Sequence, residues 1–206
     1  MRKLHLITVL CAALIPAAAF AQQSFDPWRG AIPDQKAKPA QKSEKKSAPA
    51  KTKSAGANTL TLETSKGNIV IRLRTDIAPN HVNRLRQLAN EGFYDNVPFH
   101  RVIAGFMAQT GDGQYGNGSG GSKYPDLKAE FSNVPFRRGI VGMARKGGDN
   151  NSANSQFFIM FAEQSSLNGQ YTVVGEVVSG MDVVDRINKG EPPSNPDRIL
   201  RAIAGK

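Results

Sequence analysis

Two short segments of the chain combine bulky apolar residues with a few polar groups that could face a pocket. The segment 99–112 reads FHRVIAGFMAQTGD and includes Arg101 and Gln109, while the segment 154–159 reads NSQFFI and includes Asn154 and Gln156. Neither segment has a Ser–His pair, a carboxylate dyad or a cluster of metal ligands. An apolar pocket with one fixed cation and no nucleophile suits chemistry in which no bond to the substrate is made or broken.

Each of these residues also has a structural interpretation. Phe106 and Phe158 belong to a residue type that usually fills a protein core. Gln109 could lie at a strand edge, and Asn154 could form a turn. Arg101 favours a site, because burying an unpaired guanidinium among aromatic residues is costly. The combination of residues, rather than any single one, therefore predicts a functional pocket.

Two other patterns point to weaker hypotheses. Residues Gly111–Gly116 fit the form G-x-G-x-x-G, but they run into Asn117–Gly121, which would not start the helix that a dinucleotide site requires. A flexible surface loop is the alternative interpretation. The histidines do not cluster as metal ligands would: His81 falls on a predicted helix, and His100 falls in a strand as a buried, hydrogen-bonded residue. The sequence therefore predicts neither a nucleotide cofactor nor a metal.

The elements that must position this pocket are mostly strands. Alternating or apolar β-rich runs predict strands, and TLTLET followed by SKGN predicts a hairpin. An amphipathic pattern predicts a helix that has Asp76 near its cap and Pro79 in its first turn, and that ends at Gly92. Many short strands with few helices favour a mainly β barrel or sandwich. Strands are expected over 59–64, 69–73, 99–108, 140–144, 156–160, 171–178 and 199–203, and a second short helix over 181–187.

The first 21 residues have the form of a secretory signal peptide. A charged start, an apolar run and the cleavage pattern Ala19-Phe20-Ala21 predict export and a mature N-terminus at Gln22. A membrane anchor is the alternative, but the run is short for a membrane span and polar sequence follows it. Cys11 is the single cysteine of the chain, so the mature protein would use neither disulfides nor thiol chemistry.

Residues 22–57 form a Lys/Ala/Pro-rich linker that is expected to be disordered, because it has little to bury. Arg29 and seven lysines against three acidic residues give the linker a net charge of +5, and Arg2 and Lys3 add +2 before it. Of the formal net charge of +10, only +3 therefore belongs to residues 59–206. The basic balance thus lies outside the globular part and does not indicate a nucleic-acid partner. The linker could be a solvated spacer, or it could contact anionic envelope polymers weakly.

Several motifs resemble the cyclophilin family of peptidyl-prolyl cis-trans isomerases. They are the string from Phe99 to Asp112, the string NSQFFI at 154–159, LNGQYTVVG at 167–175 and GMDVV at 180–184. The resemblance covers about residues 58–206 and is nearest to the exported, periplasmic bacterial branch. It implies a closed eight-stranded antiparallel barrel that is capped by two helices.

The resemblance also assigns roles to single residues. Arg101 matches the essential arginine, and the family pattern differs at Ser166, where many members have Trp, at Tyr171, where they have His, and at Ala104, where Pro is usual. The missing Trp implies weak binding of the drug cyclosporin. The implied catalytic residues are Arg101, Phe106 and Gln109, and the implied substrate-binding residues are Met107, Ala144, Arg145 (through its main chain), Phe158, Leu167 and Tyr171.

The implied activity is rotation of X–Pro bonds in exported proteins as they fold. Such rotation needs neither a covalent intermediate nor a cofactor or metal, and the partners would be proline-containing polypeptide clients of a monomer without a stable membrane anchor. Two alternatives stay open. The domain could be a binding module for Pro-containing segments, although pure binding does not need Arg101. It could also be an envelope adaptor whose basic linker is the functional part.

Overall fold

The computed structural model describes residue 56 and residues 58–205. The predicted signal peptide (1–21) and nearly all of the predicted linker (22–57) lie outside the described residues. Within the described part, no helix is long and apolar enough to cross a membrane. The following architecture therefore concerns the domain that the sequence places at 58–206.

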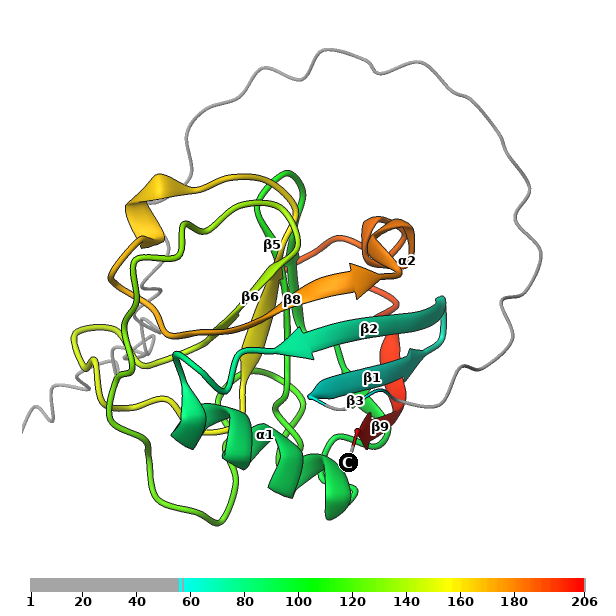
Figure 1. The fold of residues 1–206 in the computed structure, drawn as a ribbon. Helices are drawn as coiled ribbons and strands as arrows, with labels where there is room; N and C mark the ends of the chain where they lie inside the picture. The colour runs from blue at the N-terminus through cyan, green and yellow to red at the C-terminus, as the bar shows by residue number, and fades with distance from the viewer. Residues whose placement is uncertain (1–55, 57, 206) are drawn as a thin grey trace, which may run out of the picture.

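The predicted hairpin opens the domain. Strand β1 (Thr59–Thr64) pairs antiparallel with β2 (Gly67–Leu73), and Thr64 stands opposite Gly67 across the turn. The other side of β1 pairs with the last strand, whose Gly205 N–H donates to the Thr59 carbonyl at 2.8 Å. The first and last residues of the domain therefore lie next to each other, as Figure 1 shows near the label C.

All strands belong to one antiparallel sheet in the order β3-β9-β1-β2-β8-β6-β7-β5-β4. The mainly β prediction is confirmed, and every predicted strand except the one over 99–108 is found within a few residues of its expected bounds. The remaining strands are β3 (Val97–Pro98), β4 (Arg101–Ile103), β5 (Met107–Thr110), β6 (Ile140–Met143), β7 (Phe157–Met160), β8 (Val173–Ser179) and β9 (Arg198–Ala204).

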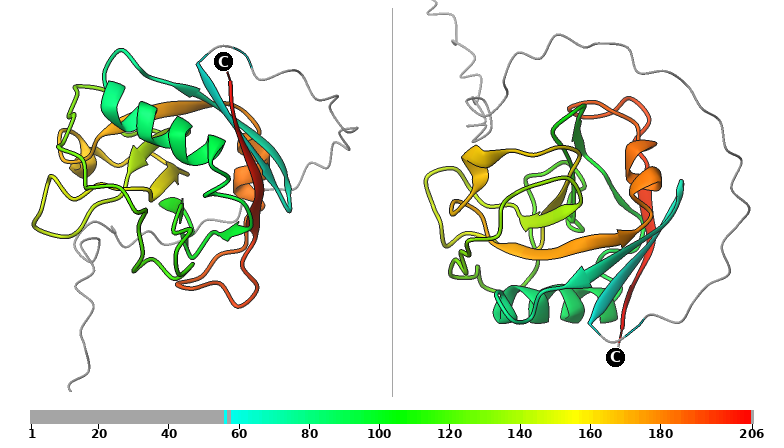
Figure 2. Two further views of the ribbon diagram at one scale, coloured as in Figure 1. Left: turned by 90° about the horizontal axis from the view of Figure 1, so that it is seen from below. Right: turned by 45° about the horizontal axis from the view of Figure 1, so that its top comes forward.

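The prediction of a closed eight-stranded barrel is wrong. The sheet has nine strands and curls into a half-barrel (Figure 2). The strand expected over 99–108 is broken by a turn at residues 104–106, which separates β4 from β5, and the short β3 adds an edge. Strands β3 and β4 end the sheet on opposite sides and are separated by only two residues of chain, so they do not form a ladder that would close it.

Two helices pack against the sheet, as expected. Helix α1 (Pro79–Asn90) begins with the predicted proline, but Ala78 rather than Asp76 occupies its N-cap, without a side-chain cap bond. The Glu130 carboxylate accepts the N–H groups of Asn80 and His81 instead. A distant acid thus satisfies the first turn, where orphan N–H groups favour negative charge. The other helices are α2 (Met181–Asp185) and the short 3-10 helix η1 (Ser165–Leu167).

The strands β5, β6 and β7 are buried on both faces, while in β4 only Val102 is fully buried. The two faces of this wall belong to different apolar clusters. Alternate side chains of a strand point to opposite faces of a sheet. One face contributes residues such as Val102, Ala108 and Phe157 to the main core. The other contributes Met107 and Phe158 to a second cluster. This second face carries the candidate site.

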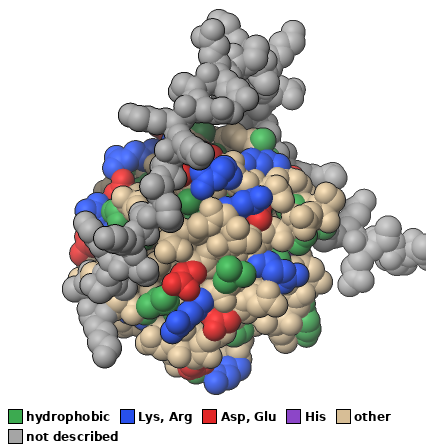
Figure 3. Space-filling view, turned by 90° about the vertical axis from the view of Figure 1, so that its right-hand side faces the viewer, with side chains coloured by type: hydrophobic (Ala, Val, Ile, Leu, Met, Phe, Trp, Pro, Cys, Tyr) green, Lys and Arg blue, Asp and Glu red, His purple; other side chains and the backbone are tan. Residues whose placement is uncertain are grey.

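The exterior carries both charge signs. On the face drawn in Figure 3, basic and acidic side chains are interspersed wherever the described residues are visible. This distribution agrees with the small net charge of +3 on residues 59–206.

Candidate functional site

The register of four strands aligns the predicted polar and apolar site residues in one row. Arg101 stands opposite Gln109 across β4 and β5, Gln109 stands opposite Phe158 across β5 and β7, and Phe158 stands opposite Gly142 across β7 and β6. Residues that are paired directly across antiparallel strands project from the same face. The row therefore brings a guanidinium, an amide and an aromatic ring onto one surface of the sheet.

Gly142 is the member of this row that has no side chain, and the rings beside it occupy the space that a side chain would fill. A Cβ at this position would lie 2.6 Å from the rings of both Phe136 and Phe158. Those two rings are stacked, with centroids 5.7 Å apart and planes 24° apart. The absence of a side chain at Gly142 on β6 therefore leaves room for the stacked rings of Phe136 and Phe158.

The apolar residues that were predicted to hold a proline ring lie together. The Tyr171 ring meets Phe158 edge-on, with centroids 5.8 Å apart. The loop that carries Leu167 is fixed over the rings, because Asn168 Oδ1 accepts the Phe136 N–H at 2.8 Å. One buried cluster contains Phe106, Met107, Ala144, Phe158, Leu167 and Tyr171. The core interpretation of these residues is thus correct as to burial, and it is compatible with a site at the edge of the cluster.

A groove of about 1230 Å³ adjoins this cluster. Arg101 and Gln109 line the groove, and so do Ala144 and Arg145. Ala144 belongs both to the groove wall and to the apolar cluster, so it marks where the two meet. The predicted site residues thus divide into a polar groove and an apolar cluster that share an edge.

Gln156 is a groove residue that was noted in the sequence for its polarity but not assigned a role. Its Oε1 accepts Gln109 Nε2 at 2.9 Å, and its Nε2 donates to the carbonyls of Gly118 and Gly120. This relay fixes the Gln109 amide against the loop that forms the groove rim. Gln156 lies two residues before Phe158 and directly before β7, and this alternation with the site-facing Phe158 is the signal that could have assigned it.

The glycine-rich segment 111–121 is a surface loop with no helix, so the loop interpretation of the G-x-G-x-x-G pattern is correct. The loop is nevertheless organised around Asp112, which is only 1% exposed. Burial alone would raise the pKa of this carboxyl, but hydrogen bonds from backbone N–H groups hold its pKa below the ordinary value. The N–H donors are those of Gln114, Tyr115, Asn117, Gly118 and Gly120.

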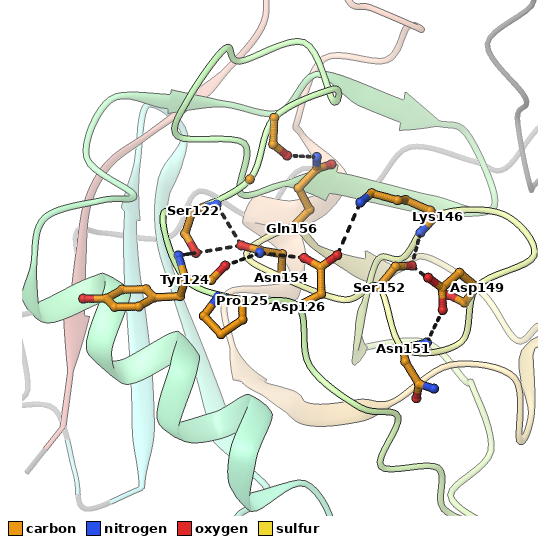
Figure 4. Close-up of polar contacts among 12 residues, drawn as sticks. Ser122, Tyr124, Pro125, Asp126, Lys146, Asp149, Asn151, Ser152, Asn154 and Gln156 are labelled. Atoms are coloured by element: carbon orange, nitrogen blue, oxygen red, sulfur yellow. Dashed lines mark hydrogen bonds and ion pairs between the residues drawn. The ribbon is translucent and has the colours of Figure 1, made fainter.

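The far wall of the groove is a second polar network (Figure 4). Asn154 Oδ1 accepts from the Ser122 N–H and hydroxyl, and its Nδ2 donates to the Tyr124 carbonyl and to Asp126 Oδ1. Lys146 Nζ completes the network at 3.3 Å from Asp126 Oδ2. Asn154 is therefore more than the turn former considered from the sequence, because it links loop 122–126 to the segment that leads through Gln156 into β7.

The two arginines of the site are held differently. Arg101 Nε donates to Glu191 Oε2 at 2.8 Å, and the Arg101 side chain is only 13% exposed. The Arg145 guanidinium lies 4.5 Å from the centroid of the Tyr171 ring and donates from Nε to the Gln170 carbonyl. The side chain of Arg145, and not only its main chain as expected, therefore covers one wall of the apolar cluster.

His100 is buried beside the groove, as expected. Burial is the main reason that its pKa lies below the ordinary value; nearby Asp112 opposes this shift and Arg101 reinforces it. Contacts with the Gln156 side chain and the Pro98 backbone also raise the pKa of the imidazole, although neither ring nitrogen has a hydrogen bond of ordinary geometry to a described residue. The predicted hydrogen bonding of His100 is therefore present only as weak contacts. In residues 58–205 no three His, Cys, Asp or Glu side chains come together as a metal-binding group.

Comparison with known proteins agrees with this arrangement. The family model described as "Cyclophilin type peptidyl-prolyl cis-trans isomerase/CLD" matches residues 59–204. A probable peptidyl-prolyl cis-trans isomerase of Brucella suis is 55% identical over 160 residues, covering 70% of this chain and 81% of the relative. A peptidyl-prolyl cis-trans isomerase of Helicobacter pylori is 41% identical over 133 residues, covering 64% and 80%.

Solved structures show the same fold. A cyclophilin from Hirschia baltica superposes with a TM-score of 0.66 at 31% identity, covering 71% of this chain and 73% of that chain. A cyclophilin-type isomerase from Cryptosporidium parvum, crystallised in the presence of the dipeptide Ala-Pro, superposes with a TM-score of 0.67 at 27% identity, covering 72% and 99%.

Proposed function

Because the chain belongs to the cyclophilin family of peptidyl-prolyl cis-trans isomerases and is itself such an isomerase, we propose that Arg101 stabilises the twisted transition state of an X–Pro bond. The observation that carries this proposal is the row Arg101–Gln109–Phe158. It places a fixed cation next to the apolar cluster in which a proline ring would sit.

Rotation about an X–Pro bond is accelerated by an electrostatic donor and does not need a nucleophile. Amide resonance gives the peptide bond a rotation barrier of about 18–20 kcal/mol. As the bond twists, the prolyl nitrogen becomes pyramidal and regains a lone pair. A guanidinium aimed at this nitrogen donates to it only in the twisted state, which is differential binding of the transition state. Arg suits this role because it stays charged and has a rigid planar fork.

The apolar cluster supplies the second contribution. Phe106, Met107 and Phe158 would grip the ring while the carbonyl of the preceding residue turns. An apolar surrounding also strengthens the field of the guanidinium and removes water that would support amide resonance. The Gln109–Gln156 relay would keep the groove rim in place beside the reacting bond.

The direct test is the isomerisation rate of Arg101→Ala in a protease-coupled assay on a short X-Pro peptide. We expect kcat/KM to fall by roughly 10²–10³, the usual cost of losing one preorganised electrostatic donor. Arg101→Lys should rescue only in part, because an ammonium lacks the fork. Arg72→Ala, which removes an exposed ion pair on β2, is the matched control. A folded Arg101→Ala protein with near-normal turnover would refute the mechanism.

For the biological setting, the proposal is that the protein is exported to the periplasm and acts there, as a monomer, on proline-containing clients during folding. Its support is the signal-peptide pattern of residues 1–21 and the cleavage pattern before Gln22. Expression in a Gram-negative host, followed by fractionation and mass spectrometry, should find a periplasmic protein that begins at Gln22. Recovery of the uncleaved chain with the membrane would contradict it.

The linker 22–57 is proposed to be a spacer, because its composition offers little to bury. Deleting these residues should leave kcat/KM on a short peptide unchanged. Co-sedimentation of full-length and deleted proteins with anionic vesicles tests the alternative of electrostatic contact. Salt-sensitive binding by the full-length protein alone would favour the tether over the spacer.

A further inference from the structure

We propose that Glu191 is a positioning residue for Arg101: its carboxylate orients the guanidinium before substrate binds. The inference rests on the proposed role of Arg101 and deepens it. The contact is direct, with Arg101 Nε donating to Glu191 Oε2 at 2.8 Å. It joins residues 90 positions apart in the chain, so no local sequence pattern reports it.

The backbone places these two side chains opposite each other. Val102 and Gly190 form an isolated antiparallel bridge with two hydrogen bonds, Val102 N–H to Gly190 O at 2.8 Å and Gly190 N–H to Val102 O at 2.9 Å. In an antiparallel bridge the residue before one partner faces the residue after the other. Arg101 therefore faces Glu191 as a cross-strand pair of opposite charge, a favourable arrangement.

The loop that carries Glu191 is itself fixed. Asp197, which is buried, accepts the Asn188 N–H at 2.9 Å and the Ser65 hydroxyl at 2.7 Å. Gly190 packs so closely that an added Cβ would lie 2.5 Å from Pro193 Cα. The carboxylate is thus presented from a short segment that is anchored on both sides of Gly190.

Two effects of the carboxylate oppose each other at the groove. Its charge weakens the positive field of Arg101, which would slow the reaction. Its hydrogen bond fixes the plane of a side chain that otherwise has several rotamers, and its charge compensates a cation that is largely buried. We infer that orientation outweighs the weakened field, because displacement of a catalytic group by about 1 Å can cost 10²-fold in rate.

The first test compares Glu191→Ala and Glu191→Gln with the unchanged protein. We expect Glu191→Ala to lower kcat about tenfold with little change in KM, since the loss lies in orientation of the group that acts on the transition state. Glu191→Gln keeps an acceptor oxygen, so its kcat should lie between those of Glu191→Ala and the unchanged protein. Glu176→Gln, which removes a carboxylate on β8 that is paired with Arg72 and Arg137, is the matched control. Thermal melts should show that all variants are folded.

The second test makes Glu191→Ala in the Arg101→Lys background. A lysine ammonium can still pair with the carboxylate, but it has no planar fork whose orientation this pairing would fix. Glu191→Ala should therefore cost less than twofold there, compared with about tenfold beside Arg101. Glu191→Ala turnover equal to or above that of the unchanged protein, or a change in KM alone, would overturn the positioning role. Intact activity in Arg101→Ala would instead overturn the proposed mechanism itself, so the two failures are distinguishable.

Discussion

In the wall formed by β4, β5, β6 and β7, the two faces of β5, β6 and β7 are buried to a similar degree but have different functions. On the face toward the main core, Phe157 packs edge-on against Tyr94, with ring centroids 5.6 Å apart. On the other face, Phe158 stacks on Phe136 and shares its row with Gln109 and Arg101. Both phenylalanines have no exposed surface.

The difference between the faces teaches that burial alone does not separate a core from a site. Here the core face and the site face differ in the type of residue that lies next to each side chain on the neighbouring strands. On the face toward the main core (the inner face), these strands carry apolar residues apart from the buried Thr110, whose hydroxyl donates to the Pro98 carbonyl. On the site face (the outer face), Phe158 on β7 is followed by an amide on β5 and a guanidinium on β4. The cluster on the outer face also borders a groove. A residue's neighbours across the sheet therefore indicate function better than its own exposure.

The largest expected effect contrasts Phe157→Ala with Phe158→Ala. Removing Phe157 leaves a cavity in the main core and should lower the free energy of unfolding by about 3–5 kcal/mol. Phe158→Ala should cost less stability, because its cluster lies beside a groove that water can enter, but it should raise KM more. Denaturant unfolding and isomerisation kinetics on both variants measure this. If both variants lost the same stability and folded Phe158→Ala had normal turnover, both faces would be structural core and neither would be a site.

The next effect tests the space left by Gly142. Gly142→Ala places a Cβ against the rings of Phe136 and Phe158, so we expect a loss of about 1–3 kcal/mol from overpacking together with a higher KM. Phe136→Leu in the same chain should recover part of the stability, because it shortens one of the two obstructing rings. If the double variant loses as much as the two single changes added together, the clash is not the cause.

Acid should affect the site face through Asp112, whose carboxylate accepts the backbone N–H groups of the loop at the groove rim. Its folded-state pKa is held below the ordinary value, so in the range between the folded and unfolded pKa values the unfolded chain binds more protons. The contribution of this carboxylate to stability is therefore complete near neutral pH and is lost as the pH falls through the folded-state pKa.

Asp112→Asn measures that contribution. We expect it to lower the free energy of unfolding at neutral pH by about 1–2 kcal/mol, since an amide cannot replace all of the N–H bonds to a charged acceptor. The difference between the two proteins should shrink as the pH is lowered. The pKa of Glu130 is also held low, but it titrates in both proteins and cancels in the comparison. A constant difference at every pH would exclude the charge as the cause.

The smallest effect concerns the cover of the outer face. Arg145→Ala removes a cation from the Tyr171 ring, a contact worth about 0.5–1 kcal/mol at exposed sites. We therefore expect a rise in KM of about two- to fivefold, with stability nearly unchanged. Arg145→Lys keeps a cation and should show a smaller rise in KM. Arg198→Ala, which removes an arginine on β9, is a control. An unchanged KM would mean that the arginine covers the ring without contributing to binding.

Much of the fold could be predicted because its signals are local. The hairpin turn, the proline that starts α1 and the alternation of the strands are all read within a few residues. Closure of the sheet could not be predicted from local signals. It depends on whether β3 and β4, which are only two residues apart in the chain, pair with each other. The turn at residues 104–106 and the two-residue length of β3 also have no periodic signal.

The candidate site divides in the same way. Residues in the two motif segments, such as Arg101 and Phe158, were found because the motifs themselves are distinctive. The residues that hold these side chains in place were not predicted, because each is far from its partner in the sequence and meets it only in the folded chain. Glu191 meets Arg101 only because Gly190 bridges to Val102, and Asp112 was recognised as part of a motif but not as the acceptor around which the loop is built.

The meeting of Gly205 with Thr59 has a practical consequence. Because the two ends of the domain are joined by a backbone hydrogen bond on β1 and β9, a short linker can connect them, and the chain can be reopened elsewhere as a circular permutant. The exposed turn at residues 147–151 is a suitable opening, since it carries neither a strand nor one of the predicted site residues. In such a permutant, a cargo fused at the new termini would stand beside the groove instead of at the β1–β9 edge.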